Sequence, residues 1–224
     1  MRRDYIYFLT RNERRIRTPN RHMLNYSALS NAPLQGDPYD HVIVPNFIEP
    51  VALDAINDNF PKIARPGSFP IGALNGGPAF TQLTEALQGD EMAAIVGEKF
   101  SVDLLKHPTM LTVRGHCRER DGKIHRDSGG KLLTVLLYLN GDWTGDGGQL
   151  RLLRSADDIE DYGATVPPTA GTLLAFRCTD DAWHGHKPYV GERRSMQLNW
   201  VSGRGYLWKE SFRHNLSAIV KKFV

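Results

Sequence analysis

Three residues in the second half of the chain have the types and the spacing of a metal site. His125 and Asp127 are two positions apart, so that on an extended segment both side chains point to the same side. A third ligand must come from elsewhere, and the segment DAWHGHKP offers two candidates, His184 and His186. Two imidazoles and one carboxylate leave three positions of an octahedral metal open, which suits an Fe(II) centre that must also bind a co-substrate and O2.

A second group of polar residues follows in the segment GERRSMQLNWV, where apolar and polar residues alternate as on a strand with two different faces. Arg193 and Ser195 share the polar face, whereas Arg194 falls on the apolar one. A guanidinium and a hydroxyl on one face can bind a carboxylate through several hydrogen bonds. The alternative is an exposed edge strand with two solvated arginines, and this stretch alone does not decide between the two.

The segment KLLTVLLYLN has the same two-faced pattern. Leucine and valine occupy alternate positions on one face, and Thr134 and Tyr138 fall on the other. A buried tyrosine usually has a hydrogen-bonding partner for its hydroxyl. Tyr138 can therefore either pack in the core or donate to a co-substrate carboxylate.

The elements that must position these residues change type along the chain. Apolar spacing predicts helices in the first half, over 51–60, 80–87 and 92–100. Short apolar segments between turns predict strands in the second half, over 109–114, 132–140, 149–154, 172–177 and 195–202. Helices followed by many short strands indicate an α+β fold whose β part is a sandwich or a barrel. The length of 224 residues fits a single domain.

The composition indicates the class of protein and the compartment in which this chemistry is expected. The chain is 41% hydrophobic and 24% charged, as in ordinary globular proteins, and no apolar run is long enough for a transmembrane helix. Its beginning, MRRDYIYFLTRNERRIR, lacks the apolar centre of a signal peptide. The two cysteines, Cys117 and Cys178, form no disulfide framework and no zinc motif. We therefore expect a cytoplasmic protein with reduced thiols and no membrane partner.

The positive charge is concentrated at the start of the chain. Residues 1–21 contain seven arginines and two acidic residues, a net charge of +5, whereas the whole chain carries +3. A basic arm can bind nucleic acid, but this one has no recognisable nucleic-acid motif, no lysine-rich block and no interleaved stacking platform. A solvated or packed arm is the simpler expectation, and no nucleic-acid partner is predicted.

With these residues in view, the span from about 109 to 202 resembles the catalytic domain of the prolyl-4-hydroxylase-type branch of the 2-oxoglutarate/Fe(II) oxygenases. The resembling segments are HRD, KLLTVLLYLN, DWTGDGGQLRLL, AGTLLAF, WHGHKP and GERRSMQLNW, in that order. The resemblance implies a double-stranded β-helix, a jelly-roll of two sheets, over 109–202. Residues 1–108 would supply the basic arm and supporting helices, and 203–224 a C-terminal tail or helix.

The resemblance also implies a role for each matching residue. His125 and Asp127 match the family's His-x-Asp pair, and His184 matches its distal histidine, because Pro188 follows four residues later. Fe(II) would thus be held by His125, Asp127 and His184, with 2-oxoglutarate as co-substrate and O2 as oxidant. The residues expected to bind 2-oxoglutarate are Arg193, at its far carboxylate, and Ser195, Tyr138 and Thr134. No further acid–base or nucleophilic residue is expected, since the metal supplies the chemistry.

The chain departs from the family at one place. Many relatives have a tyrosine about ten residues before the first ligand, where this chain has VRGHCRERDGK, and Arg114, His116 or Arg118 is the candidate for that position. The presence of Asp127 disfavours the related halogenases, in which a small residue replaces the carboxylate. The second substrate is not identified; a protein or peptide is favoured by analogy with prolyl and lysyl hydroxylases. The alternatives are a cupin-like metal dioxygenase and a jelly-roll binding module, neither of which uses 2-oxoglutarate.

Overall fold

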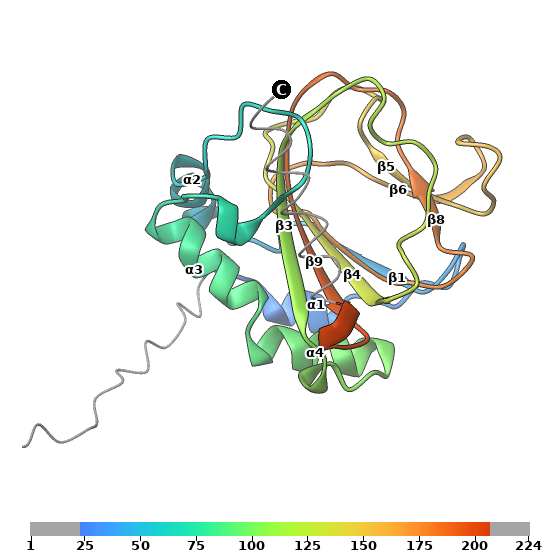
Figure 1. Cartoon of the computed structure of the whole chain (residues 1–224), viewed down its shortest axis with the longest axis horizontal. Coiled ribbons are helices and arrows are strands. Elements are labelled where there is room, and N and C mark those ends of the chain that lie inside the picture. Colours follow the sequence, from blue (N-terminus) through green and yellow to red (C-terminus); the bar gives the residue numbers. More distant parts are fainter. Residues whose placement is uncertain (1–22, 207–224) are drawn as a thin grey trace, which may run out of the picture.

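The computed structural model describes residues 23–206 of the chain (Figure 1). The α-helices in this range are α1 (Tyr26–Asn31), α2 (Pro50–Asp58), α3 (Pro78–Leu87) and α4 (Asp90–Phe100). The strands are β1 (His41–Val44), β2 (Phe69–Pro70), β3 (Thr109–Cys117), β4 (Lys131–Tyr138), β5 (Leu150–Leu153), β6 (Tyr162–Val166), β7 (Leu173–Arg177), β8 (Trp183–Gly185) and β9 (Gly191–Val201). The predicted basic arm over 1–21 lies outside the described residues, as does most of the tail over 203–224.

The larger of two sheets has six strands in the order β1-β7-β4-β9-β3-β2, and all its neighbours are antiparallel. Strands β4 and β9 lie side by side near its centre. Their register sets Thr134 opposite Asn199 and Tyr138 opposite Ser195. Because directly opposed residues of antiparallel strands point to the same face, these four polar side chains share one face of the sheet.

The smaller sheet has the order β6-β5-β8 and faces that polar side of the larger one (Figure 1). An apolar cluster joins the two sheets. It contains Leu152 and Val166 from the small sheet and Leu174 and Phe176 from the large one. The two facing sheets give the jelly-roll architecture expected from the sequence. Strand β8 matters most for the site, since it contains His184.

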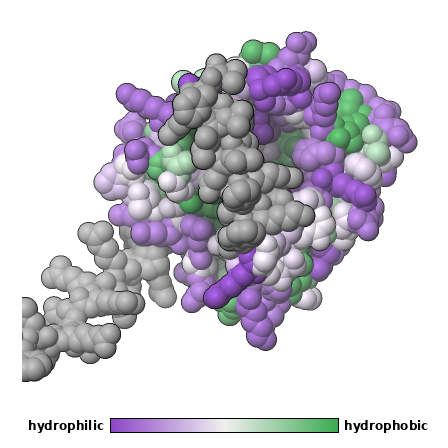
Figure 2. Space-filling view, viewed as in Figure 1, coloured by the Kyte–Doolittle hydropathy of each residue, from purple (hydrophilic) through white to green (hydrophobic). Residues whose placement is uncertain are grey.

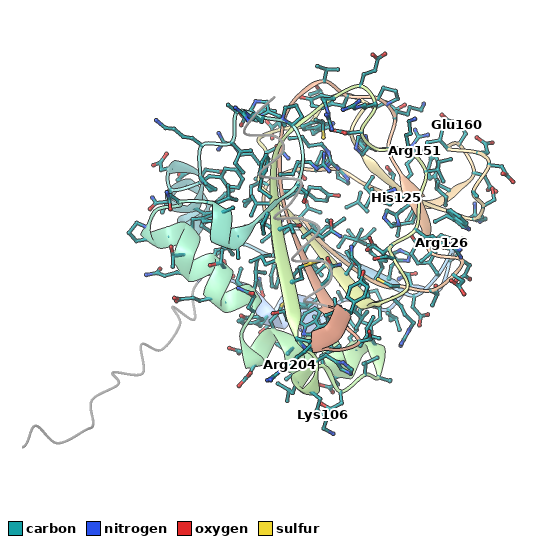
Figure 3. The ribbon with its side chains drawn as sticks, viewed as in Figure 1. Lys106, His125, Arg126, Arg151, Glu160 and Arg204 are labelled. Carbon is teal, nitrogen blue, oxygen red and sulfur yellow. The ribbon has the colours of Figure 1, made fainter. Side chains whose placement is uncertain are left out.

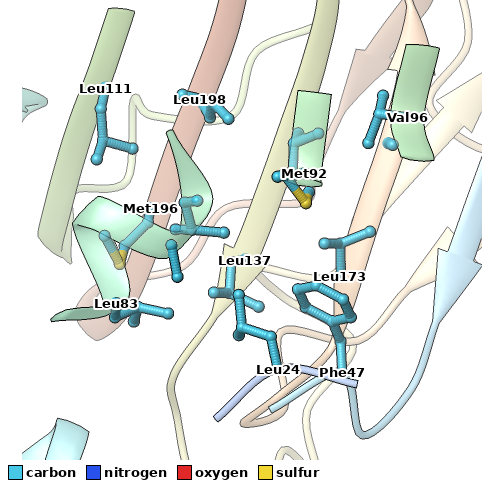
Figure 4. Packing of buried hydrophobic residues seen from close by; sticks show 14 of the residues in the cluster. Leu24, Phe47, Leu83, Met92, Val96, Leu111, Leu137, Leu173, Met196 and Leu198 are labelled. Atoms are coloured by element: carbon cyan, nitrogen blue, oxygen red, sulfur yellow. The ribbon is translucent and has the colours of Figure 1, made fainter. Parts of the chain in front are cut away.

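The helices cover the opposite face of the larger sheet. Helix α3 begins with Pro78 at its first turn and buries Phe80, Leu83 and Leu87, which recur at helical spacing. Figure 4 shows residues of α3 and α4 packed against leucines and methionines of the sheet, among them Leu137 and Met196. The apolar sides of β4 and β9 therefore face the main core. Their polar sides face the second sheet, as the alternation in the sequence predicted.

The elements expected from the sequence are largely present. The three predicted helices correspond to α2, α3 and α4, and the five predicted strands to β3, β4, β5, β7 and β9. Helix α1 and strands β1, β2, β6 and β8 were not predicted. Helix α2 has only a weak apolar face, because Val51 is 85% exposed and Ile56 alone is fully buried.

One expectation about the site is corrected by the fold. His125 and Asp127 do not lie on a strand; His125 forms a single antiparallel bridge with His184, and the chain then leaves the sheet. The two side chains still converge, while Arg126 turns away to Asp180, whose carboxylate lies 3.1 Å from its guanidinium (Figure 3). The local convergence thus comes from one bridge followed by an irregular segment over 126–128, not from strand alternation.

None of the helices among residues 23–206 is long and apolar enough to cross a membrane. The face seen in Figure 2 is mainly hydrophilic, with small, separate hydrophobic areas. The large apolar side chains that are exposed, Leu34, Val51, Leu105 and Val190, are likewise dispersed over different segments.

Candidate metal centre and co-substrate pocket

The backbones of His125 and His184 are hydrogen-bonded to each other in both directions. The amide of His125 donates to the carbonyl of His184 over 2.9 Å, and the amide of His184 donates back over 2.8 Å. Beside this bridge, the amide of His186 donates to the carbonyl of Gly122 over 2.8 Å. The segment 122–125 is thereby fixed along β8, and the two imidazole centroids are 4.3 Å apart.

The ring nitrogens of both histidines are oriented for a metal. Nδ1 of His125 lies 2.8 Å from the carbonyl of Lys123, and Nδ1 of His184 lies 3.0 Å from the carbonyl of Ala182. A carbonyl can only accept, so each Nδ1 carries the proton and each Nε2 keeps its lone pair. One ligand atom from each of His125, Asp127 and His184 lies within 4.8 Å of the others. This donor set and its tautomers fit a ferrous ion.

The protonation states also fit a metal. Burial, with the adjacent His125, lowers the pKa of His184 to about 4, so that its ring is neutral at pH 7. Burial alone would raise the pKa of Asp127, but the Lys131 ammonium and two hydrogen bonds hold it below its usual range. His184 therefore offers a neutral imidazole and Asp127 a carboxylate, the forms that bind metal ions.

Both carboxylate oxygens of Asp127 have partners in the protein. The ammonium of Lys131 lies 2.8 Å from Oδ1, and both side chains of this ion pair are largely buried. The hydroxyl of Thr134 donates to Oδ2. The sequence analysis missed Lys131; its position four residues after Asp127, at the start of β4, was the available signal.

Arg193 lies in a pocket of about 110 Å³ between the two sheets. Its side chain is buried, with 5% of the residue exposed. Nε donates to the carbonyl of Gly148 over 2.8 Å, and Nη2 donates to the hydroxyl of Tyr138 over 3.4 Å. Among residues 23–206, no acidic side chain forms an ion pair with Arg193. A buried guanidinium without an acid is favourable only if an anion binds it.

The same pocket contains all four residues predicted to bind the co-substrate and both candidate histidine ligands. Its polar lining consists of Arg114, His125, Thr134, Tyr138, His184, His186, Arg193, Ser195 and Gln197. Its apolar lining consists of Leu136, Leu150 and Phe176, with Gly122 and Gly185. The pocket thus joins the metal-ligand candidates to a buried cation, although Thr134 directs its hydroxyl to Asp127.

Arg194 and His186, which are neighbours of the predicted site residues Arg193 and His184, are placed differently. Arg194 is on the opposite face of β9, where its Nε lies 2.6 Å from a carboxylate oxygen of Glu192 and its guanidinium stacks over Phe60. His186 lines the pocket, but it is not in the group of three ligand atoms. Burial and the nearby Arg193 lower the pKa of His186 to about 4.

Of the three residues considered for the tyrosine position, Arg114 alone lines the pocket, and it pairs with Asp121 over 3.1 Å. His116 points to the other side of the sheet, where Nδ1 contacts the carbonyl of Ile63 over 2.7 Å. The reason is a shift in strand register: Arg114 is opposite Ser195, but His116 is opposite Glu192. A bulge of this kind turns following side chains to the other face.

Comparison with known proteins agrees with this site. Residues 113–202 match the sequence model of the family described as the 2OG-Fe(II) oxygenase superfamily. The matched segment contains the three candidate metal ligands together with Tyr138 and Arg193. No curated protein matches the chain in sequence.

Solved structures of similar fold come from several organisms. A prolyl-4-hydroxylase from Pseudomonas putida is 19% identical, with a TM-score of 0.52 over 79% of this chain and 90% of that chain. An oxidoreductase of the 2OG-Fe(II) oxygenase family from Burkholderia pseudomallei is 14% identical, with a TM-score of 0.51 over 79% and 90% of the two chains. A truncated viral collagen prolyl hydroxylase from Paramecium Bursaria Chlorella virus-1 is 15% identical, with a TM-score of 0.51 over 77% and 94%.

At these identities the solved structures establish the fold, which is the double-stranded β-helix of prolyl-4-hydroxylase-type enzymes. The family match identifies residues 113–202 as a domain of the 2-oxoglutarate/Fe(II) oxygenase superfamily. The match over these residues supports a 2-oxoglutarate-dependent oxygenase. Its implied cofactors are Fe(II), 2-oxoglutarate and O2, in agreement with the donor set of the site.

Proposed function

We propose that the protein hydroxylates a second substrate while it converts 2-oxoglutarate to succinate and CO2. One oxygen atom of O2 enters succinate and the other enters the hydroxyl group of the product. In this proposal His125, Asp127 and His184 hold Fe(II), and Arg193 binds the far carboxylate of 2-oxoglutarate. Residues 109–202 are the catalytic core, and the helices before them support it within one domain.

The observation that carries this proposal is the position of Arg193. It is a buried guanidinium with no acidic partner among the described residues, in the same pocket as His125 and His184. Its Nη2 also donates to Tyr138, and this contact holds the guanidinium in place. A small dianion can bind the metal through one end and the guanidinium of Arg193 through the other.

The remaining residues orient the co-substrate and limit access of water. Ser195 lies next to Arg193 on the polar face of β9 and can donate to the same carboxylate. Leu136 and Phe176 form an apolar wall, which strengthens charge interactions in the pocket by excluding water. When bound, iron supplies the activation of O2, and the protein supplies geometry and a closed site.

For the second substrate we favour a protein or peptide side chain. The support is analogy: two of the solved structures with this fold are a prolyl-4-hydroxylase and a collagen prolyl hydroxylase. A shared fold leaves the substrate open. Arg114, which lines the pocket, is the first residue to examine.

The test is calorimetric titration of 2-oxoglutarate with Mn(II) in the absence of oxygen, followed by detection of succinate with Fe(II) in air. We expect metal-dependent binding of 2-oxoglutarate and slow succinate formation even without a second substrate. The matched control is His125→Ala, which keeps the pocket and Arg193 but lacks one metal ligand.

Three outcomes would replace this function with another. Metal binding without binding of 2-oxoglutarate would favour a cupin-like metal dioxygenase. Binding of neither metal nor 2-oxoglutarate would favour a jelly-roll binding module. If 2-oxoglutarate binds but no succinate forms in air, the protein is a binding module that retains the co-substrate site.

A further inference from the structure

A chain of buried hydrogen bonds runs across the large sheet to the candidate ligand Asp127. The amide nitrogen of Asn199, on β9, donates to the hydroxyl oxygen of Thr134, on β4, over 2.6 Å. That hydroxyl donates in turn to Oδ2 of Asp127. Asn199 is 1% exposed and Thr134 is 0% exposed, so water does not replace either contact.

The direction of each hydrogen bond in this chain is fixed by chemistry. Thr134 has a single hydroxyl proton, and the carboxylate of Asp127 can only accept. Asn199 fills a lone pair of the Thr134 oxygen. The Cys178 sulfur lies 3.2 Å from the same oxygen, but the Asp127 carboxylate is the stronger acceptor, so the hydroxyl proton is directed to Asp127. On the far side of Asn199, the amide of Gln197 lies 3.4 Å from its carbonyl oxygen and donates to it. The order of donation is therefore Gln197 to Asn199 to Thr134 to Asp127.

We propose that Thr134 and Asn199 are positioning residues that fix the Asp127 carboxylate for metal binding. The sequence assigned Thr134 to the co-substrate, whereas the geometry assigns its hydroxyl to the metal ligand. Lys131 holds Oδ1 and the relay holds Oδ2, so the carboxylate cannot rotate without breaking a buried contact. Partners behind a ligand commonly change metal affinity by about 10–100-fold when they are removed.

The test is the dissociation constant of Mn(II), measured by electron paramagnetic resonance without 2-oxoglutarate or oxygen. Thr134→Val keeps the shape of the side chain and removes its hydroxyl, and we expect Mn(II) to bind about 10–100-fold more weakly. Thr134→Ser keeps the hydroxyl and should restore affinity. Asn199→Leu should weaken binding less, because it leaves the Thr134 hydroxyl in place but frees it to rotate.

The double variant Thr134→Val with Asn199→Leu separates a relay from two independent effects. If Asn199 acts through Thr134, the double variant binds Mn(II) as weakly as Thr134→Val alone. The visible spectrum of bound Co(II) gives a second readout, because its bands depend on ligand geometry. We expect altered bands in Thr134→Val and bands like those of the unmodified protein in Thr134→Ser.

A matched control for the loss of a buried threonine hydroxyl is Thr84→Val in α3. Thr84 is 7% exposed, and its hydroxyl donates to the carbonyl of Thr81 over 2.7 Å. This variant should lower stability but leave Mn(II) affinity and the Co(II) bands unchanged. Unchanged affinity in Thr134→Val, equal weakening in Thr134→Ser, or full additivity in the double variant would overturn the relay.

The inference rests on the proposed function, because it takes Asp127 as a metal ligand. Asp127→Ala keeps the two failures apart. If Asp127→Ala binds Mn(II) as tightly as the unmodified protein, the ligand set of the proposed function is wrong and the relay falls with it. If Asp127→Ala loses binding while Thr134→Val does not, only the relay is wrong.

Discussion

His125 and His184 exchange both backbone hydrogen bonds, at 2.9 and 2.8 Å, and this one bridge sets their imidazoles side by side. The side chain of each then donates Nδ1–H to a carbonyl of its own segment. The same pairing thus fixes the distance between the two rings and leaves an Nε2 lone pair on each. Each ring of the pair therefore keeps the lone pair that a metal ion requires.

Replacing any of the three proposed ligands should abolish metal binding. We expect His125→Ala, Asp127→Ala and His184→Ala each to weaken Mn(II) binding by more than the roughly 100-fold upper range for outer partners, since a ligand itself is lost. The control is His186→Ala, which removes a neighbouring imidazole of the same pocket and should keep most of the affinity. Loss of binding in His186→Ala, with binding kept in His184→Ala, would exchange their roles.

Of the two consecutive arginines of β9, only Arg193 should affect binding of the co-substrate. Removing a buried charge partner commonly costs about 2–5 kcal/mol, so Arg193→Ala should weaken 2-oxoglutarate binding roughly thirty-fold to several thousand-fold. Arg194→Ala should leave this affinity unchanged, because Arg194 pairs with Glu192 on the other face. The measurement is anaerobic calorimetry with Mn(II).

Arg193→Lys adds information on geometry. A lysine keeps the charge but not the planar fork, so an intermediate affinity is expected. A large loss in Arg194→Ala alone would mean that the facing of the strand is reversed. No loss in either variant would show that neither arginine binds the co-substrate.

The metal-free protein should lose stability in mild acid. Burial lowers the pKa of both His184 and His186 to about 4, against an unfolded value of 6.5. The unfolded state therefore binds more protons between these values, so stability is full above about pH 6.5 and falls as the pH drops to about 4. Each histidine contributes about 3 kcal/mol to this loss. Urea unfolding at several pH values measures it.

His186→Gln provides the control for acid stability, because glutamine does not titrate. The decrease in the free energy of unfolding between pH 6.5 and pH 4 should be about half as large in this variant. An equal decrease in both proteins would contradict the assignment of the effect to the two buried histidines.

Both cysteines should be free yet slow to react in the folded protein. Cys117 is buried, and burial together with the adjacent Asp127 raises the pKa of Cys178 to about 12. Roughly one Cys178 thiol in ten thousand is then ionised at pH 8, and the thiolate is the reactive form. Iodoacetamide should label neither residue quickly in buffer and both in guanidinium chloride, as measured by mass spectrometry. Fast labelling of Cys178 in the folded protein would contradict the raised pKa.

Strand periodicity was the part of the sequence that predicted the site best. The alternation along β4 and β9 correctly separated Tyr138 and Arg193, which line the pocket, from Leu137 and Met196, which lie in the core. A period of two leaves each side chain only two possible faces, and burial of the apolar set decides between them. The facing of Arg194 followed from the same rule.

The contacts around Asp127 could not be predicted in this way. Lys131, Thr134 and Asn199 come together through the pairing of β4 with β9 and through an irregular segment after His125. Neither the register of distant strands nor the path of an irregular segment is encoded in local periodicity. The pocket position of Arg114 was left open for a related reason, because it depends on the bulge beside it.

That bulge has a consequence for the charge of the pocket. From Arg114 to His116 strand β3 advances two residues, while its partner β9 spans three, from Ser195 back to Glu192. If one residue of β9 were deleted here, the hydrogen-bonded ladder could continue without interruption. With Ser195 unmoved, Arg193 would then turn to the helices and Glu192 would enter the pocket in its place. Without the bulge, the pocket would thus present a carboxylate to an anionic ligand. The attraction between the pocket and such a ligand therefore depends on an irregularity in strand pairing.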